Sequence, residues 1–560
     1  MSGPRATSWG RAWPAAWALG LGVLLLGPAL GPGFVLGYDM VWVPRLALRP
    51  DFLGLGSALP RAVPSDTVVA VLDNLVPGML LQKVVLLGVL VLAGAGAAAM
   101  TRSAPWYSRL AATTFYVWNP FVVERLVIGH WPLLAGYAVL PWLAVMARDS
   151  RAGRSTPALG PLVVLGSLSA SAGIITAVAL WSSEARRGLP RRRALVLVAL
   201  SAAANAPWVV SGLLHVASAT SSREGARVFA LHGEGLLPGP LAALGLGGIW
   251  NAEVVPVTRT GVLAVVGLVV VAALAVVAVV RRRETPRDGL PLAGLVTCWV
   301  LGWGWAVFTW AAPGASGWLG ASVPGAGLMR DGSRTLALCA PLLALVVARA
   351  IAVLVPLLVE RVTRSLVAVL LALVPLALMP DAAWGVSGRL GAVDYPASYD
   401  RVRAAVGDRG DVLVLPLSSY RAPTWNEGRK VLDPTGRYLR PDYLASDVLV
   451  VDRRALPGED PRVRAVDRAL AGPDPARALA RLGIRTVVTD EGAPPAALRE
   501  VPITLNVGGL VVQTLSDPVR RDGSVAEDVA LSGAWLAFVL ALLAWFPAVS
   551  SRRIRRGARA

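Results

Sequence analysis

The chain is poor in the residues from which most soluble enzymes and extracellular modules are built. Only 16% of its 560 residues are charged, against about 25% in soluble globular proteins. Its two cysteines, Cys298 and Cys339, both lie in apolar runs, which excludes a disulfide framework and a cysteine metal site. The sequence also has no phosphate-binding loop ending in Lys-Ser or Lys-Thr, no His-Glu-x-x-His and no Cys-x-x-Cys. It therefore carries none of these soluble-enzyme signatures.

Lysine is nearly absent as well. Lys83 and Lys430 are the only two, so arginine supplies almost all of the positive charge. A formal net charge of +19 would indicate nucleic-acid binding if a basic soluble domain carried it. Here the arginines form short runs between apolar segments, as at 191–193 and 281–283, which is typical of cytoplasmic membrane boundaries. We therefore expect no nucleic-acid partner. The preference for arginine is also typical of a GC-rich bacterium such as an actinobacterium.

Hydrophobic residues are in excess, at 55% of the chain, and the mean hydropathy is +0.59. A membrane-spanning helix needs about 17–25 mostly apolar residues. Runs of this kind lie near 13–37, 80–100, 110–128, 132–147, 194–214, 260–280, 289–312, 335–357, 365–380 and 527–548. Together with a hairpin described next, they predict an α-helical polytopic membrane protein with about 11–12 membrane helices.

A further apolar stretch at 156–182 is interrupted by the small residues from Ser167 to Gly173. Each half is too short for an ordinary span, and basic residues flank both ends, so we predict a hairpin of two short or tilted helices. One long tilted helix is the alternative. It would place several arginine clusters on the opposite side of the membrane, whereas the hairpin keeps them together.

The arginines of the short loops set the expected orientation. With both termini cytoplasmic, most of these arginines face the cytoplasm, as the positive-inside rule requires, and the protein is a multi-pass protein of the plasma (inner) membrane. The predicted domains are a transmembrane domain at 1–380 with an outer loop at 38–79, an extracytoplasmic domain at 381–525, and a last membrane helix with a basic cytoplasmic tail at 526–560. The outer loop is expected to lie along the membrane surface.

The segment at 381–525 is polar enough to fold in water. Its pattern predicts a buried strand at 411–416, a helix at 475–482 and a second strand at 484–490, after the helix-stopping Gly483. Strands that alternate with helices are typical of an α/β domain. We therefore predict a C-terminal extracytoplasmic α/β domain, followed by the final membrane helix.

Ionisable residues recur at the predicted outer ends of the helices. Asp39 follows the first apolar run, Arg125 and His130 lie at the end of the third, and Arg330 and Asp331 precede a later one. Charges near the hydrocarbon boundary cost energy unless they are paired, hydrated or lining a cavity. Each residue alone fits an ordinary solvated interfacial charge, but their recurrence favours a polar cleft at the outer membrane surface.

Several short motifs give the chain a resemblance to a known architecture. They are GYDM at 37–40, NPF at 119–121, GHWP at 129–132 and MRDGSR at 329–334, together with the small-residue hairpin and the outer α/β domain. The arrangement resembles the GT-C superfamily of membrane glycosyltransferases, which includes actinobacterial arabinofuranosyl- and mannosyltransferases. The resemblance implies transfer of a sugar from a polyprenyl-phosphate donor to an outer-face glycan or lipid of the cell wall.

The resemblance also implies roles for individual residues. Asp39 matches an acidic position in the family's first loop and is the predicted general base, which takes the proton of the acceptor hydroxyl. Cations must stabilise the departing lipid phosphate. The predicted substrate-binding residues are Arg330, Arg334, Arg125, His130, Asp331 and, for stacking on the acceptor sugar, Trp425 in the loop at 420–426.

Many family members carry two adjacent acidic residues in the first loop, whereas here Asp39 is followed by Met40. No metal site is therefore predicted, although the resemblance is also compatible with a bound divalent cation. Because of this difference, a non-catalytic membrane scaffold or sugar-binding protein is an alternative. A second alternative is an envelope-lipid transporter. Transporters carry charges near the membrane midplane and internal repeats, and the sequence shows neither.

Overall fold

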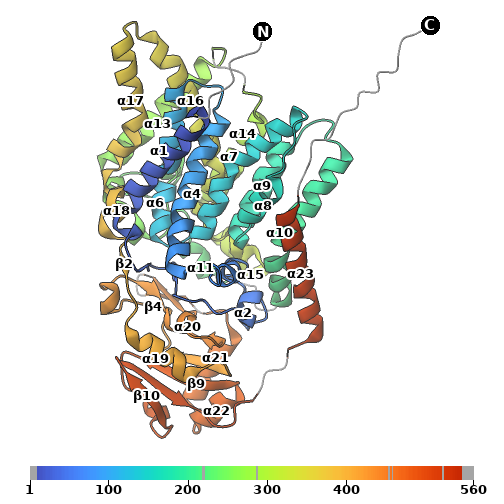
Figure 1. Ribbon diagram of the computed structural model, residues 1–560, viewed down its shortest axis with the longest axis vertical. Coiled ribbons are helices and arrows are strands. Elements are labelled where there is room, and N and C mark those ends of the chain that lie inside the picture. Colours follow the sequence, from blue (N-terminus) through green and yellow to red (C-terminus); the bar gives the residue numbers. More distant parts are fainter. Residues whose placement is uncertain are drawn as a thin grey trace, which may run out of the picture.

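A computed structural model describes residues 9–57, 59–216, 221–284, 288–451, 454–456, 458–519 and 523–544. Figure 1 shows a bundle of helices at one end of the molecule and a sheet domain at the other. The bundle is built from the first two thirds of the chain and the sheet domain from the part that follows. The last described helix, α23 (Val525–Leu543), then returns to pack along the bundle.

Eight helical stretches of the described residues are long and apolar enough to cross a membrane. They are Ala12–Leu30, Gly78–Met100 (α4), Arg191–Leu214 (α10), Val262–Val280 (α13), Leu292–Ala311 (α14), Gly332–Leu357, Arg361–Leu378 (α17) and Val525–Leu543 (α23). Each coincides with an apolar run of the sequence, so the chain is a multi-pass membrane protein. The runs at 110–128 and 132–147 and the hairpin also form helices, which are shorter or less apolar than these eight.

The run at 110–128 forms two helices, α5 (Trp106–Val117) and α6 (Pro120–Val127), so the expectation of one segment there is wrong. The break has a local cause. Asn119 is extended, and its side-chain oxygen accepts a hydrogen bond at 3.2 Å from a backbone N–H in the first turn of α6, which makes it an N-cap. Pro120 occupies the first helical position, where a backbone N–H is not needed.

The interrupted stretch at 156–182 forms α8 (Leu159–Leu165) and α9 (Ala170–Glu184). The guanidinium of Arg193 lies 3.5 Å from the hydroxyl of Thr156, before α8, and 2.5 Å from a carboxylate oxygen of Glu184, at the end of α9. Both ends of the helix pair therefore lie on the same side of the bundle. This arrangement is the predicted hairpin, and it excludes one long helix.

The sheet domain contains a five-stranded mixed sheet in the order β10–β11–β9–β3–β6. Its strands are β3 (Asp411–Leu415), β6 (Tyr443–Leu444), β9 (Ile484–Asp490), β10 (Ile503–Val507) and β11 (Leu510–Thr514). Strand β3 is parallel to β6 and β9, whereas β11 is antiparallel to both β9 and β10. The predicted strands at 411–416 and 484–490 and the predicted helix, α22 (Pro475–Arg481), are all present.

The central strand β3 contributes side chains to two cores, because alternate residues of a strand face opposite ways. Leu413 belongs to a cluster with Val466 and Val487, between the sheet and the helices α21 (Pro461–Leu470) and α22. Val412 and Val414 belong instead to the large core that continues into the bundle. The sheet domain is thus packed onto the membrane part of the protein over a shared apolar core.

The loop at 38–79 is held against the sheet domain through the buried guanidinium of Arg49. This side chain donates hydrogen bonds at 2.7–3.1 Å to the backbone carbonyls of Gly436, Arg437, Leu439 and Pro441. In Figure 1 the short helix α2 (Pro50–Leu53), which follows Arg49, lies between the bundle and the sheet domain. This part of the loop therefore contacts the sheet domain. That the loop lies along the membrane surface stays a prediction.

Candidate active site

The backbone of Asp39 lies where the bundle meets the sheet domain. Its N–H donates to the carbonyl of Ile128, in the link between α6 and α7 (Trp131–Arg151), at 3.1 Å. On the other side, Tyr38 exchanges two hydrogen bonds of 2.7 Å with the backbone of Lys430 and Leu432. Asp39 is therefore fixed from both parts of the protein.

Gly129 explains why the GHWP motif begins with glycine. Its φ angle is +87°, a conformation that favours glycine. A Cβ atom at this position would lie 2.1 Å from the backbone nitrogen of Met40. The glycine thus allows the link before α7 to approach the Asp39 turn closely, and it brings His130 beside the carboxylate.

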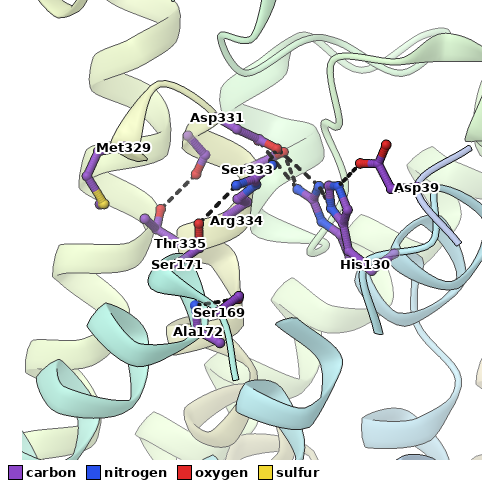
Figure 2. A network of polar contacts seen from close by, with 12 residues as sticks. Asp39, His130, Ser169, Ser171, Ala172, Met329, Asp331, Ser333, Arg334 and Thr335 are labelled. Carbon is purple, nitrogen blue, oxygen red and sulfur yellow. Dashed lines mark hydrogen bonds and ion pairs between the residues drawn. The ribbon is translucent and has the colours of Figure 1, made fainter. Parts of the chain in front are cut away.

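Both carboxylate oxygens of Asp39 accept a hydrogen bond. The Nε2 atom of His130 lies 3.0 Å from Oδ2, and the hydroxyl of Tyr420 donates to Oδ1. Figure 2 shows the His130 ring facing Asp39. The Asp39 side chain is nonetheless 39% exposed, so the carboxylate is oriented by the protein and open to a ligand.

The tautomer of His130 follows from its second partner. The Nη1 atom of Arg125 lies 3.2 Å from Nδ1 of the ring. Because a guanidinium can only donate, Nδ1 accepts, and Nε2 carries the proton that is donated to Asp39. Burial lowers the pKa of His130 below its ordinary value, although the hydrogen bond to Asp39 opposes this effect. His130 is therefore a neutral donor at neutral pH.

The environment of Asp39 favours its ionised form. Desolvation alone raises the pKa of this carboxyl group. The hydrogen bonds from His130 and Tyr420 and the positive charge of Arg334 outweigh it, so that the pKa lies below its ordinary value. Asp39 is thus a carboxylate at neutral pH, as a group that accepts a proton from an alcohol must be.

The second nitrogen of the His130 ring is contacted by a member of a buried ion pair. Arg125 and Asp331 are 1% and 2% exposed, and their charged atoms lie 3.2 Å apart. Arg125 also donates to the hydroxyl of Ser333 at 2.5 Å. Buried in this way, Arg125 and Asp331 orient His130 from within the protein. Their predicted role in substrate binding stays a prediction.

Arg334 connects this ion pair to the tip of the hairpin. It donates to Asp331 at 3.0 Å and to the hydroxyl of Ser171, near the start of α9, at 2.9 Å; Figure 2 shows both contacts. Its side chain is only partly buried, and its charge acts on Asp39. The structure thus brings Asp39, His130, Arg334 and the Arg125–Asp331 pair into one network.

Arg330 lies outside this network and belongs to a second cluster. Its guanidinium sits 4.5 Å from the ring centre of Phe229 and pairs with Glu459, in the sheet domain, at 3.1 Å. Glu459 also pairs with Arg61 at 2.7 Å. Burial raises the pKa of Glu459, but the two arginines outweigh it and keep the carboxylate ionised. Arg61 is 54% exposed, so this cluster also offers an accessible cation.

Trp425 lies apart from Asp39 in the contacts that define the site. Its ring packs on those of Tyr395 and Tyr399, at centroid distances of 5.0 and 5.6 Å, inside the sheet domain. The sequence-selected loop at 420–426 does reach the site, but through Tyr420. A contact between Trp425 and an acceptor sugar stays a prediction.

Three residues of this region were not predicted from the sequence, namely Tyr420, Arg61 and Glu459. Tyr420 and Glu459 lie far from Asp39 along the chain, whereas Arg61 lies in the same outer loop as Asp39, and no local motif marks any of the three. Among the described residues, no group of three histidine, cysteine or acidic side chains is placed to hold a metal ion. The residue after Asp39 is the buried Met40, so a second carboxylate does not stand there.

No family model and no curated protein matches the chain. A solved structure has a similar fold. It is the cryo-EM structure of arabinofuranosyltransferase AftD from mycobacteria, which matches with a TM-score of 0.52 and 16% sequence identity over 92% of this chain. A mutant of that protein gives a TM-score of 0.49 at 15% identity. The chain spans only 40% of the AftD chain, so the likeness shows a shared fold.

Proposed function

We propose that this protein is a cell-envelope glycosyltransferase, which moves a sugar from a polyprenyl-phosphate donor to an outer-face glycan or lipid. One observation carries the proposal. An ionised, partly exposed carboxylate, Asp39, is held by His130 and Tyr420 next to several arginines, in a fold that also occurs in an arabinofuranosyltransferase.

In the proposed reaction, the acceptor hydroxyl oxygen attacks the anomeric carbon of the donor sugar. A new C–O bond forms while the bond between that carbon and the phosphate oxygen breaks. Asp39 takes the hydroxyl proton as the nucleophile forms. The electron pair of the broken bond leaves with the polyprenyl phosphate, whose negative charge needs cations nearby.

Three partly exposed arginines are suited to that phosphate. Arg334 and Arg61 both interact electrostatically with Asp39, and Arg330 shares Glu459 with Arg61. A guanidinium binds a phosphate through two parallel hydrogen bonds. We assign the donor phosphate to this group of arginines, which leaves the exposed edge of Asp39 for the acceptor.

A direct test supplies the purified protein with lipid-linked sugars, beginning with polyprenyl-phosphate arabinose. The expected result is release of polyprenyl phosphate that depends on an added glycan acceptor. Tight binding of donor or glycan without release would favour the sugar-binding alternative. Movement of an unmodified lipid across vesicle membranes that contain the protein would favour a transporter.

Arg330→Lys is expected to raise the KM for the lipid-linked donor about tenfold while the fold is retained. The reason is that an ammonium group keeps the charge but cannot make two parallel hydrogen bonds to one phosphate. Such a loss corresponds to about one charge-assisted hydrogen bond. The measurement is the initial rate as a function of donor concentration in detergent or vesicles.

Arg440→Lys is a matched control, because Arg440 pairs with Asp408 at 2.8 Å on the exposed surface of the sheet domain. Its donor KM is expected to equal that of the wild type. An unchanged donor KM in Arg330→Lys would mean that Arg330 only joins Glu459 to Phe229.

The proposed location of the site outside the cytoplasm is tested by labelling. Helix α7 has 21 residues and is therefore about 30 Å long, roughly the thickness of the hydrocarbon core. It starts beside Asp39, so its far end, at Ala152, should lie across the membrane from the sheet domain. Ala152 and Ala497, in the sheet domain, are both exposed.

An impermeant thiol reagent applied to intact cells is expected to label Ala497→Cys and not Ala152→Cys. Both variants should react after the membrane is opened. The native Cys298 and Cys339 are buried, so they should give little background. Labelling of Ala152→Cys alone in intact cells would reverse the proposed orientation and place the sheet domain in the cytoplasm.

A further inference from the structure

The sheet domain reaches Asp39 through a two-stranded ribbon. Strand β4 (Tyr420–Arg421) pairs in antiparallel fashion with β5 (Val431–Leu432), and Tyr38 forms a parallel bridge with Val431 on the other edge of β5. Tyr38, the residue before Asp39, is therefore bridged to the edge of this ribbon. The backbone at the catalytic position is fixed by residues of the sheet domain.

The ribbon is itself anchored to the five-stranded sheet by Arg421. This side chain pairs with Asp433 at 2.6 Å and with Asp490, at the end of β9, at 3.4 Å. It also donates to the carbonyl of Leu415, at the end of β3, at 2.9 Å. Arg421 is almost fully buried. Its contacts therefore also hold the backbone of Tyr420, the residue before it, in place.

The hydroxyl of Tyr420 is a donor to Asp39 at all ordinary pH values. Burial, together with the adjacent Asp39 carboxylate, raises the pKa of Tyr420 well above its ordinary value, so the hydroxyl keeps its proton. The Tyr420 ring also packs edge-on against that of Tyr38 at a centroid distance of 6.3 Å. The ring and the hydroxyl are thus both held in place.

We propose that Tyr420 is a positioning residue for the catalytic carboxylate and that the sheet domain forms half of the active site. With Tyr420 on Oδ1 and His130 on Oδ2, the Asp39 carboxylate cannot rotate freely. Each oxygen still has acceptor capacity, and the side chain is partly exposed, so an acceptor hydroxyl can reach it. The inference rests on the proposed function, because it gives Tyr420 a role only if Asp39 acts as the base.

Tyr420→Phe removes one hydroxyl and leaves the ring in place. We expect the turnover number to fall about tenfold, as expected for the loss of a hydrogen bond to a charged group, with the donor KM unchanged. The acid limb of the pH–rate profile should move to higher pH. The sign follows because the Tyr420 hydrogen bond stabilises the carboxylate and lowers the pKa of Asp39; without it, Asp39 is protonated at a higher pH.

Tyr438→Phe is the matched control. The Tyr438 hydroxyl donates to the carboxylate of Asp400 at 2.7 Å, in the same domain but away from Asp39. The control loses the same atom and the same kind of hydrogen bond, so its acid limb and turnover number should equal those of the wild type. Thermal unfolding of both variants checks that they are folded.

The outcomes separate this inference from the proposed function. If Tyr420→Phe keeps the wild-type turnover number and acid limb while Asp39→Asn is inactive, Tyr420 has no positioning role and the enzyme assignment stands. A lower turnover number with an unmoved acid limb, shared with Tyr438→Phe, also overturns the inference, because it reveals only a structural effect. Full activity of Asp39→Asn would refute the proposed function itself.

Discussion

Replacement of Asp39 by asparagine is expected to lower sugar transfer by about 10²- to 10⁴-fold, the contribution typical of general-base catalysis. Asparagine keeps the shape of the side chain and one oxygen that can accept a hydrogen bond from His130 or Tyr420. It cannot take the proton of an acceptor hydroxyl. Donor binding and thermal stability should therefore change little. The rate is measured as release of polyprenyl phosphate, and binding is measured separately with the lipid-linked sugar.

Asp51→Asn is the comparison that makes this result specific, because Asp51 is the next acidic residue along the same loop. It lies in the short helix α2, against the sheet domain, and its backbone N–H donates to Asp442 at 3.2 Å. Transfer by this variant should remain near the wild-type rate. Near-normal transfer by Asp39→Asn would leave Asp39 as an interfacial charge and favour the scaffold alternative.

Arg125→Leu should have the largest effect on stability, with a loss of about 3 kcal/mol or more in the free energy of unfolding. The change leaves the carboxylate of Asp331, which is 2% exposed, without its buried partner. Arg334 and Ser333 still contact Asp331, which keeps the expected loss at the lower end of the usual range for a broken buried pair. Thermal unfolding in detergent measures it.

Two further variants separate charge burial from packing. Arg125→Leu combined with Asp331→Asn removes the carboxylate that has lost its buried partner, and should recover part of the lost stability. Arg440→Leu breaks an exposed ion pair and should cost no more than about 1 kcal/mol. If Arg125→Leu were no less stable than Arg440→Leu, the buried pair would contribute no more to the stability of the fold than an exposed one.

The membrane part of the fold could be predicted because its signals are local. The length of each apolar run, the interruption at Ser167–Gly173 and the positions of the arginines decided the spans and the hairpin. The strands β3 and β9 were equally clear, because each is a short apolar run beside a turn signal. The break before α6 was missed although Asn119 and Pro120 form a helix start, since the apolar run continues through them.

The site could be predicted only in part. Asp39 follows an apolar run of the sequence, and His130 and Arg125 lie at the ends of helices. Charges in such places cost energy unless they are paired or hydrated, and the structure joins the three residues. Tyr420 and Trp425 lie in one loop, and sequence alone gives no reason to prefer one aromatic residue to the other. The direction of each side chain depends on the ribbon of β4 and β5, whose pairing with Tyr38 is a long-range contact.

The hydrogen bond between Tyr420 of the sheet domain and Asp39 also decides when, during synthesis of the chain, the site can form. Asp39 and Tyr420 are 381 residues apart in the chain. At a synthesis rate of about 5–20 residues per second, roughly 20–80 s pass between the emergence of the first and that of the second from the ribosome. During that interval the nascent bundle already holds Asp39 and His130 but lacks the ribbon that orders them. Under the proposed function, the growing chain should therefore acquire activity only after the ribbon of β4 and β5 has been translated and has folded onto the bundle.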